Sequence, residues 1–375
     1  MPNNLRILVI ADGYGEISSS PRIRFFCKYW SQKGYEIEVF CEKGKAIDFE
    51  HTYPIVEVPI YKTKSGIEWA FKSVLNLLFD YKERCFYKKV REAVAHKQYN
   101  AVFCTTFSTF PLKTAWQIAK EKNIPLFLDI RDLVEQLDAI YWQMQSHQSW
   151  LLRPVGNLFT KINVRRRDAI LPHATHIFTV SPWHANFLKK INANVSLIYN
   201  GYDSDQFFFE AVKSDKFMIS YIGKRYDYQD DSLLYESLKQ LDLPDVEVHF
   251  YPSQQHALIP IEQVGDTIRK SSIILVLTSP LVKGVLGTKF YEGLGCEKPI
   301  LCTQSDEGLL AQTIRELNAG IASSNLEEIK AFILDKYNEW KTNGFTHQNV
   351  VEQRKNFFSR QHQTQTMDEI MLSKL

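Results

Sequence analysis

Short apolar runs alternate with helix-forming segments along most of the chain, and this alternation constrains the fold more than any other feature. The first run, 5–11, is apolar at nearly every position, as expected for a strand covered on both faces. Further strands are expected at 35–42, 56–61, 101–106, 125–130, 176–180 and 195–199, with helices at 21–31, 67–96, 112–122, 150–171 and 183–190. Repeated strand–helix alternation predicts a parallel, doubly wound sheet.

The pattern restarts after a turn-rich segment at 200–207 and a polar segment at 210–216. The second series has expected strands at 217–223, 246–251, 273–277 and 299–303, and helices at 231–240, 262–270, 289–294, 309–317 and 326–341. We therefore predict an α/β protein with two Rossmann-like doubly wound domains, 1–205 and 216–347, facing a cleft. A polar helical tail, 348–375, could pack back on the N-terminal domain.

Composition places the chain among globular proteins and gives no sign of a nucleic-acid partner. It is 45% hydrophobic and 23% charged, and its formal net charge of +2 is small for 375 residues. The six cysteines form no CxxC pair, which indicates buried free thiols in a reducing compartment. The apolar run at 5–11 is too short for a signal peptide, and no run approaches the ~20 residues of a membrane span. A cytoplasmic protein is expected.

The segment 287–301 carries the strongest chemical signal. It reads as a short helix that begins at Gly287 and Thr288 and is followed at once by a strand. Free backbone N–H groups at such a helix start bind anions, and Lys289 adds a cation beside them. Glu292 lies three residues further, on the same helix face, where a carboxylate suits two neighbouring hydroxyls. A site for phosphate and for a diol would suit the ribose-diphosphate end of a nucleotide. The structural alternative is that Lys289 and Glu292 form a solvated ion pair.

Several further motifs, taken in order, resemble glycosyltransferase family 4, whose members have the GT-B fold. They are Ser20-Pro-Arg-Ile-Arg24 after a Gly- and Ser-rich loop, Asp129-Ile-Arg-Asp132, Thr179-Val-Ser-Pro182, Ile198-Tyr-Asn-Gly-Tyr-Asp203, Tyr221-Ile-Gly-Lys224 and Lys289-Phe-Tyr-Glu-Gly-Leu-Gly-Cys-Glu-Lys-Pro-Ile300. The resemblance spans nearly the whole chain. It implies a retaining, metal-independent transfer of a sugar from a UDP- or GDP-linked donor to a glycan, glycolipid or polyprenyl-linked acceptor, in surface polysaccharide synthesis. No cofactor besides the donor is implied.

The candidate site residues follow from these motifs. The expected donor-binding residues are Gly13, Gly15, Gly223, Lys224, Arg225, Gly287, Thr288, Lys289 and Glu292. The expected catalytic residues are Lys224, Arg225 and Asp129, and the expected acceptor-binding residues are Arg22, Arg131 and Asp132. Cations and backbone amides suit a metal-free transfer, because they can absorb the negative charge that develops on the leaving phosphate. For the three residues of 129–132, a salt-bridged structural corner is the competing interpretation.

Two departures from the family pattern keep other functions open. Gly284 stands where the family often has the first glutamate of a Glu-x7-Glu motif, and Lys224 replaces a usual arginine. A non-catalytic nucleotide-sugar-binding subunit therefore remains an alternative, as does a sugar-nucleotide epimerase or hydrolase of the same architecture.

Two other features are weaker. His173 with His176, and Asp203-Ser-Asp205, have too few ligands or the wrong place for a metal site, so none is expected. The segments 69–91 and 141–167 are rich in aromatic and basic residues. They could lie on the anionic inner surface of a membrane. Alternatively, they could pack on the sheet as amphipathic helices whose basic side faces the solvent.

Overall fold

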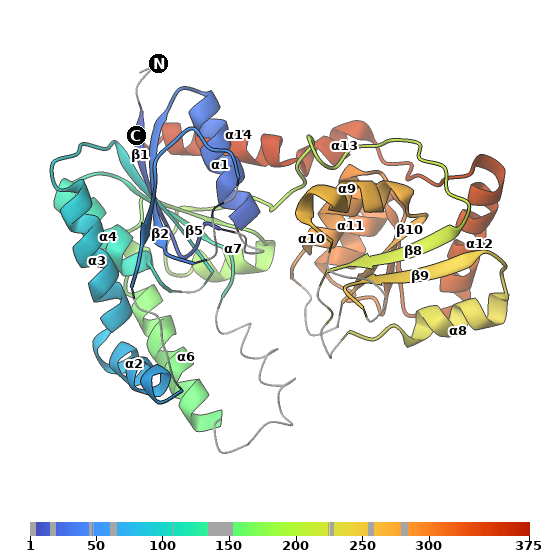
Figure 1. Cartoon of the computed structure of the whole chain (residues 1–375), viewed down its shortest axis with the longest axis horizontal. Helices are drawn as coiled ribbons and strands as arrows, with labels where there is room; N and C mark the ends of the chain where they lie inside the picture. The colour runs from blue at the N-terminus through green and yellow to red at the C-terminus, as the bar shows by residue number, and fades with distance from the viewer. Residues whose placement is uncertain are drawn as a thin grey trace. The chain divides into compact units, whose positions relative to one another are not determined.

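The protein is described here by a computed structural model of the 375-residue chain. It describes residues 5–15, 20–44, 47, 49–60, 66–107, 109–133, 153–223, 225, 229–253, 259–278 and 284–375. The chain divides into unit 1, Met1–Ile198 with Thr364–Leu375, and unit 2, Tyr199–Gln363. Each unit contains one parallel sheet with helices on both faces, which confirms the predicted pair of α/β domains (Figure 1).

Unit 1 has a seven-stranded sheet in the order β3-β2-β1-β4-β5-β6-β7. Its strands are β1 (Arg6–Ala11), β2 (Glu36–Glu42), β3 (Ile55–Val58), β4 (Ala101–Thr106), β5 (Leu126–Ile130), β6 (His176–Thr179) and β7 (Val195–Leu197). Its helices are α1 (Ser20–Gln32), α2 (Gly66–Phe79), α3 (Tyr81–Val94), α4 (Leu112–Lys122), α6 (Arg153–Asp168) and α7 (Pro182–Leu188), with a short 3-10 turn at Leu171–His173.

Alternation along β1 explains why helices cover both faces of this sheet. Leu8 and Ile10 pack into one core with residues of α3, α4 and α7, whereas Ile7 and Val9 pack into the other. The second core contains α1 and the last helix, α14 (Arg360–Leu372) (Figure 1). Successive side chains of a strand point to opposite faces, so a continuous apolar run requires two covers.

The predicted helix at 67–96 is two helices, α2 and α3. Asp80 separates them with a left-handed backbone, φ 55. An aspartate tolerates that conformation better than most residues, but a helix cannot continue through it. Apolar and basic residues continue on both sides of Asp80, so the periodicity gave no sign of the break.

Unit 2 has a five-stranded sheet in the order β12-β11-β10-β8-β9. The strands are β8 (Phe217–Ile222), β9 (Val246–Tyr251), β10 (Ile273–Leu277), β11 (Ile300–Thr303) and β12 (Gly320–Ser323). The helices are α8 (Ser232–Leu241), α9 (Ile261–Lys270), α10 (Thr288–Gly295), α11 (Leu309–Leu317), α12 (Leu326–Asn343) and α13 (Glu352–Phe357). The sequence did not predict β12, whose four residues are too few and too small to form a distinct apolar run.

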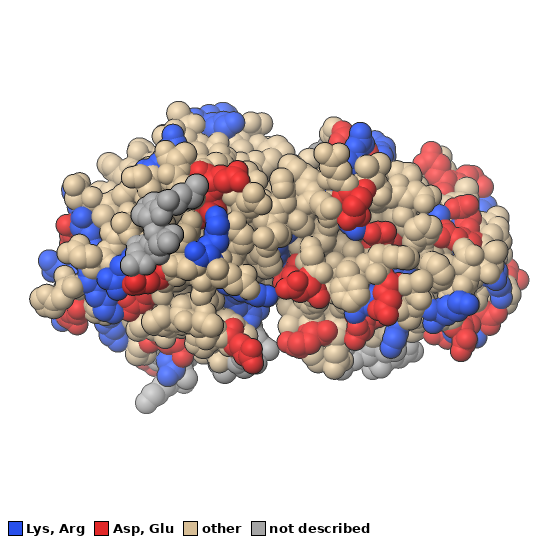
Figure 2. Space-filling view, turned by 90° about the horizontal axis from the view of Figure 1, so that it is seen from above, with Lys and Arg blue, Asp and Glu red and all other residues tan. Residues whose placement is uncertain are grey.

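Charged side chains of both signs are interspersed over the face shown in Figure 2. The described residues of this face therefore form no continuous basic surface.

The C-terminal helix is fixed to unit 1 through Asp368, which is 1% exposed. Its carboxylate accepts hydrogen bonds from Trp30 Nε1 at 3.1 Å and Lys33 Nζ at 2.7 Å. Met367 and Met371 on either side of it belong to the same core as Trp30. Of the polar tail 348–375, the part Thr364–Leu375 therefore completes the core of unit 1, whereas 348–363 belongs to unit 2.

We expect Asp368→Ala to lower the free energy of unfolding of unit 1 by about 2–3 kcal/mol, because it leaves the buried indole N–H without an acceptor. Tryptophan fluorescence reports this transition, since six of the seven tryptophans lie in unit 1 and Trp340 alone lies in unit 2. Glu369→Ala, at an exposed position of the same helix, should leave the transition unchanged. Equal stability of the two variants would contradict the anchoring role.

A buried carboxyl, Glu83, holds the beginning of α4. It accepts hydrogen bonds from the backbone N–H groups of Lys113 and Thr114 and from the Thr114 hydroxyl at 2.6 Å. Burial nevertheless raises the pKa of Glu83 to about 7. The folded protein thus retains this proton at pH values where the unfolded chain has lost it.

Unit 1 should therefore lose stability as the pH rises from about 4.5 to above 7, by at most about 3 kcal/mol from this group. Below the ordinary glutamate pKa the contribution of Glu83 is complete, and above the folded pKa it is lost. Denaturant titrations at a series of pH values test this, and Glu83→Gln should flatten the dependence. A slope that is unchanged in Glu83→Gln would contradict it.

Candidate functional site

In unit 2 the end of β8 lies against the first turn of α10. Gly223, directly after β8, has a φ of 120°, and a Cβ there would lie 3.1 Å from Lys289 Nζ. A residue with a side chain would therefore be strained and would displace the lysine. Gly223 allows the Lys289 ammonium to lie directly on the backbone at the carboxyl end of the strand, where ligands of parallel sheets bind.

Lys289 and Glu292 both lie on α10 and are partly buried. The Lys289 ammonium is 4.6 Å from the centre of the Tyr221 ring. Neither charged group has a hydrogen-bond or ion-pair partner within the parts of the chain that the structure describes. Burial lowers the pKa of Lys289, an effect that the charge of Glu292 opposes. Two opposite charges thus lie close together with their hydrogen-bonding capacity available to a ligand.

The beginning of α10 presents backbone donors beside this lysine. Gly287 occupies the N-cap position with extended backbone and no capping side chain, and both Gly287 and Thr288 are exposed. The first N–H groups of a helix have no partner within the helix, so they can bind an anion. This turn therefore supplies amides to the same place as Lys289.

The two other predicted cations of the donor site are Lys224 and Arg225. Lys224 lies outside the described residues. Arg225 forms an ion pair with Asp231, Nη2 to Oδ1 at 2.7 Å, and its guanidinium is 5.3 Å from the centre of the Phe250 ring. Nearly half of the Arg225 side chain is exposed, so it remains accessible to a ligand.

The sequence missed two polar residues that support Lys289. The Tyr221 hydroxyl donates to Gln229 Oε1 at 2.9 Å, and Gln229 Nε2 donates to the Leu277 carbonyl at 2.9 Å. These bonds connect β8 to the end of β10 beneath the lysine. Tyr221 stands in a motif that the sequence singled out, whereas nothing in the sequence indicated Gln229.

Arg360 is a third residue that the sequence missed. Burial raises the pKa of Glu292, and the positive charges of Lys289 and Arg360 oppose that rise. Arg360 begins α14, and its backbone N–H donates to the Tyr202 carbonyl at 2.8 Å. Gly201 makes this approach possible, since a Cβ there would lie 2.8 Å from the Phe358 carbonyl oxygen and its φ is 63°. No local pattern relates position 360 to position 292.

Unit 1 brings the other predicted residues together at the carboxyl ends of β1, β4 and β5. Asp129 is fully buried on β5 and forms an ion pair with Arg22 of α1 at 2.9 Å. The Thr105 hydroxyl donates to the same carboxylate at 2.9 Å. Arg22 is itself only 4% exposed and lies 4.8 Å from the centre of the Phe26 ring. The carboxylate of Asp129 is thus enclosed by protein donors.

Asp12 and Arg131 form the second pair of this cluster. Arg131 Nη2 lies 3.2 Å from Asp12 Oδ1, and the Phe107 backbone N–H donates to Asp12 Oδ2 at 2.7 Å. Burial raises the pKa of Asp12 despite Arg131, and it raises the pKa of the neighbouring Asp132 to about 6. Asp132 therefore titrates near neutral pH at the end of its strand.

Gly13 and Gly15 follow β1 directly, and Tyr14 between them is buried with its hydroxyl 2.8 Å from that of Tyr53. Residues 16–19 of this loop lie outside the described residues. The loop thus begins at the same sheet edge as Asp12, and the predicted contact of its glycines with donor stays a prediction.

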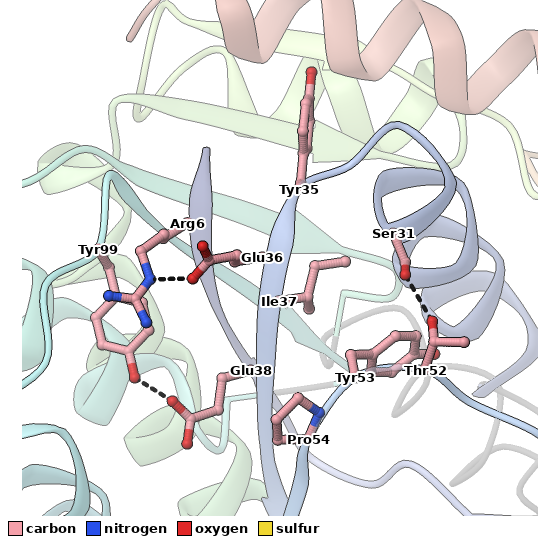
Figure 3. A pocket seen from close by; sticks show the side chains of 10 residues that line it. All are labelled: Arg6, Ser31, Tyr35, Glu36, Ile37, Glu38, Thr52, Tyr53, Pro54 and Tyr99. Atoms are coloured by element: carbon pink, nitrogen blue, oxygen red, sulfur yellow. Dashed lines mark hydrogen bonds and ion pairs between the residues drawn. The ribbon is translucent and has the colours of Figure 1, made fainter. Parts of the chain in front are cut away.

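A surface pocket lies at the other end of unit 1, where β1 and β2 begin (Figure 3). Its charged groups already pair with protein groups: Arg6 with Glu36 at 2.6 Å, and Glu38 with Tyr99 and with Lys97. Parallel sheets bind ligands at the opposite edge. We therefore place the candidate site at the carboxyl ends.

Within the described residues, no group of three or more His, Cys, Asp and Glu side chains could hold a metal ion. His176 contacts Ser196 at 2.9 Å through Nε2, and burial lowers its pKa to about 4. Its environment is that of a buried neutral histidine.

Residues 22–206 match the model of Glycosyltransferase Family 4. No curated protein matches the chain in sequence.

Among solved structures, HepE of Anabaena, crystallised with UDP and glucose, superposes with a TM-score of 0.67 at 13% identity, covering 98% of this chain and 100% of that one. A glycosyltransferase of Rickettsia africae gives 0.60 at 14% identity, with 99% of each chain covered. The galactosyltransferase WaaB of the lipopolysaccharide outer core gives 0.59 at 12% identity, covering 99% of this chain and 100% of that one. Residues 22–206 thus match glycosyltransferase family 4, and the chain has the GT-B fold of these solved structures.

Proposed function

We propose that the protein is a retaining glycosyltransferase that takes a sugar from a UDP- or GDP-linked donor. The acceptor would be a glycan, a glycolipid or a polyprenyl-linked sugar in the cytoplasm, and the product a surface polysaccharide precursor. One observation carries the proposal: the Lys289 ammonium lies against Gly223, beside the first amides of α10, with Glu292 one turn further.

Donor binding follows from the charges of this constellation. The ammonium of Lys289 and the amides at 287–289 would hold the diphosphate, and the carboxylate of Glu292 would accept from both ribose hydroxyls. Glu292 must be ionised for this role. Burial opposes ionisation, but Lys289 and Arg360 lower the pKa of the carboxyl and thereby favour it.

Transfer requires charge stabilisation on the leaving group more than a general base. As the bond between the anomeric carbon and the phosphate oxygen breaks, negative charge develops on the diphosphate, which Lys289, Lys224 and Arg225 would stabilise. The acceptor oxygen then bonds to the same face of the anomeric carbon, and its proton passes to the departing phosphate oxygen. Retention of configuration follows from attack on that face.

We assign the acceptor to unit 1. Arg131 and Asp132 lie at the carboxyl edge of the sheet, where Asp132 would accept from acceptor hydroxyl groups. Arg131 is 6% exposed and pairs with Asp12, so it would orient this edge. Arg22 and Asp129 form an ion pair in the protein interior. We therefore propose that they position this edge of the sheet and act on the acceptor through its neighbouring residues.

The donor is tested by measuring binding and turnover with a panel of UDP- and GDP-sugars. UDP-glucose is the first choice because HepE of Anabaena was crystallised with it. Nucleotide release that depends on added acceptor supports transfer. Free sugar without acceptor indicates a hydrolase, an interconverted nucleotide sugar indicates an epimerase, and binding without turnover indicates a non-catalytic subunit. Failure to bind any nucleotide would overturn the proposal.

A further inference from the structure

Helix α2 presents an apolar stripe to solvent. Phe71, Val74 and Leu78 are 62%, 50% and 63% exposed, and their spacing of three and four residues places them on one face of the helix. Phe79, at the end of the helix, is 53% exposed. A water-soluble surface rarely presents such side chains together, so this group points to a binding surface.

The helices next to α2 carry exposed cations at the same spacing. On α6, the exposed positions Leu158, Lys161 and Arg165 share one face. On α3, Tyr81, Arg84 and Lys88 do so as well. Helix α6 lies beside α2, as Figure 1 shows. Arg166 joins the two helices by donating to the Asn76 and Leu77 carbonyls at 3.0 and 2.8 Å.

These cations are not neutralised by the protein. Among the described residues, Arg84, Lys88, Lys161 and Arg165 have no ion-pair partner. On α2 and α6 the described acids are Glu68, which pairs with Lys72, and Asp168, which pairs with Arg167. On α3, Glu83 is buried, and the exposed Glu92 follows the two exposed cations Arg84 and Lys88. The apolar stripe of α2 is therefore bordered by net positive charge.

We propose that this surface, the apolar stripe of α2 with the cations of α3 and α6, binds the face of an anionic phospholipid bilayer. Apolar side chains enter the boundary between headgroups and acyl chains, while neighbouring lysines and arginines attract anionic lipid. Among the described residues, no helix is long and apolar enough to span a bilayer. The 14 residues of α2 would thus lie along the surface. The unpaired cations favour an anionic bilayer over a second copy of this chain, which would bring like charges together.

The test is flotation of the full-length protein with lipid vesicles. Vesicles with about one-third phosphatidylglycerol should bind the protein at low salt, and both pure phosphatidylcholine and about 0.5 M salt should reduce binding about tenfold. Phe71→Ser with Leu78→Ser should also reduce partitioning about tenfold or more. The matched control, Ile261→Ser with Leu334→Ser, changes apolar side chains that are 44% and 39% exposed in unit 2 and should bind as the wild type does.

Charge is tested separately. Lys161→Glu with Arg165→Glu should abolish the preference for anionic vesicles, whereas Lys239→Glu with Lys270→Glu in unit 2 should not. Absence of vesicle binding, or equal binding by the α2 variant and the wild type, would overturn the proposal. So would concentration-dependent dimerisation that the α2 substitutions abolish without any lipid binding. None of these results depends on donor or activity, so the proposed function is tested apart from this surface.

Discussion

Replacing Lys289 with alanine should weaken binding of the donor nucleotide by about tenfold to a hundredfold. A hydrogen bond to a charged group contributes about 1.5–3 kcal/mol, and every 1.4 kcal/mol is a factor of about ten in affinity. Glu292→Ala should have an effect of similar size, because the ribose hydroxyls lose their acceptor. Calorimetric titration with UDP and GDP measures both effects. The controls are Lys270→Ala and Glu236→Ala, which change exposed residues of unit 2.

The pH dependence of binding distinguishes a ligand role of Glu292 from a structural one. Burial raises the pKa of Glu292 above the ordinary glutamate value, so nucleotide affinity should fall as the pH decreases through that raised pKa. Glu292→Gln should bind more weakly than the wild type and lack this dependence. If both alanine variants bind nucleotide as the wild type does, the donor site is misassigned, whatever the chain binds elsewhere.

Replacing Asp129 with alanine should destabilise unit 1 by about 3–5 kcal/mol, because it leaves the Arg22 guanidinium buried without a counter-charge. Asp129→Asn should cost less, since an amide can still accept from Thr105 and Arg22. The double variant Arg22→Met with Asp129→Asn removes both charges and should recover much of the stability. Tryptophan fluorescence during denaturant unfolding measures each effect.

The same variants separate a structural Asp129 from a catalytic one. Nucleotide binding by unit 2 should survive in all of them. If Asp129→Asn is as stable as the wild type and yet has lost turnover with bound donor, then Asp129 acts on the reacting groups. If turnover falls only where stability falls, Asp129 is a positioning residue. Glu92→Ala, at an exposed position of α3, is the control for unit 1.

Much of the fold could be predicted because its strands are buried on both faces. Runs such as Ile7–Ala11 must be apolar throughout, so the sequence alone is enough to recognise them as strands. The elements that escaped prediction depend on single backbone positions or on very short segments. Asp80 divides one helical pattern in two through its φ of 55°, and β12 has only four residues.

The candidate donor site could be predicted where its residues are neighbours in sequence. Lys289 and Glu292 share a helix face at a spacing of three, so a helix was enough to bring them together. Arg360 and Gln229 could not be found in this way, since they reach the site from other elements. Likewise, the pairing of Arg22 with Asp129 joins residues 107 positions apart, and only the sheet brings α1 to the end of β5.

The sequence by itself thus determined the two parallel α/β sheets and the local pattern of glycine, lysine and glutamate on α10. Both can be predicted from short-range periodicity, because strand and helix geometry relate residues that are only two to four positions apart. The tertiary structure decided which charges are enclosed and which remain available. The Asp129 carboxylate accepts from Arg22 and Thr105, whereas the partly buried Lys289 ammonium lies against Gly223 with no hydrogen-bond partner among the described residues. The burial and the pairing of a charged side chain depend on contacts with residues that are far away in the sequence. Local sequence patterns therefore cannot predict them.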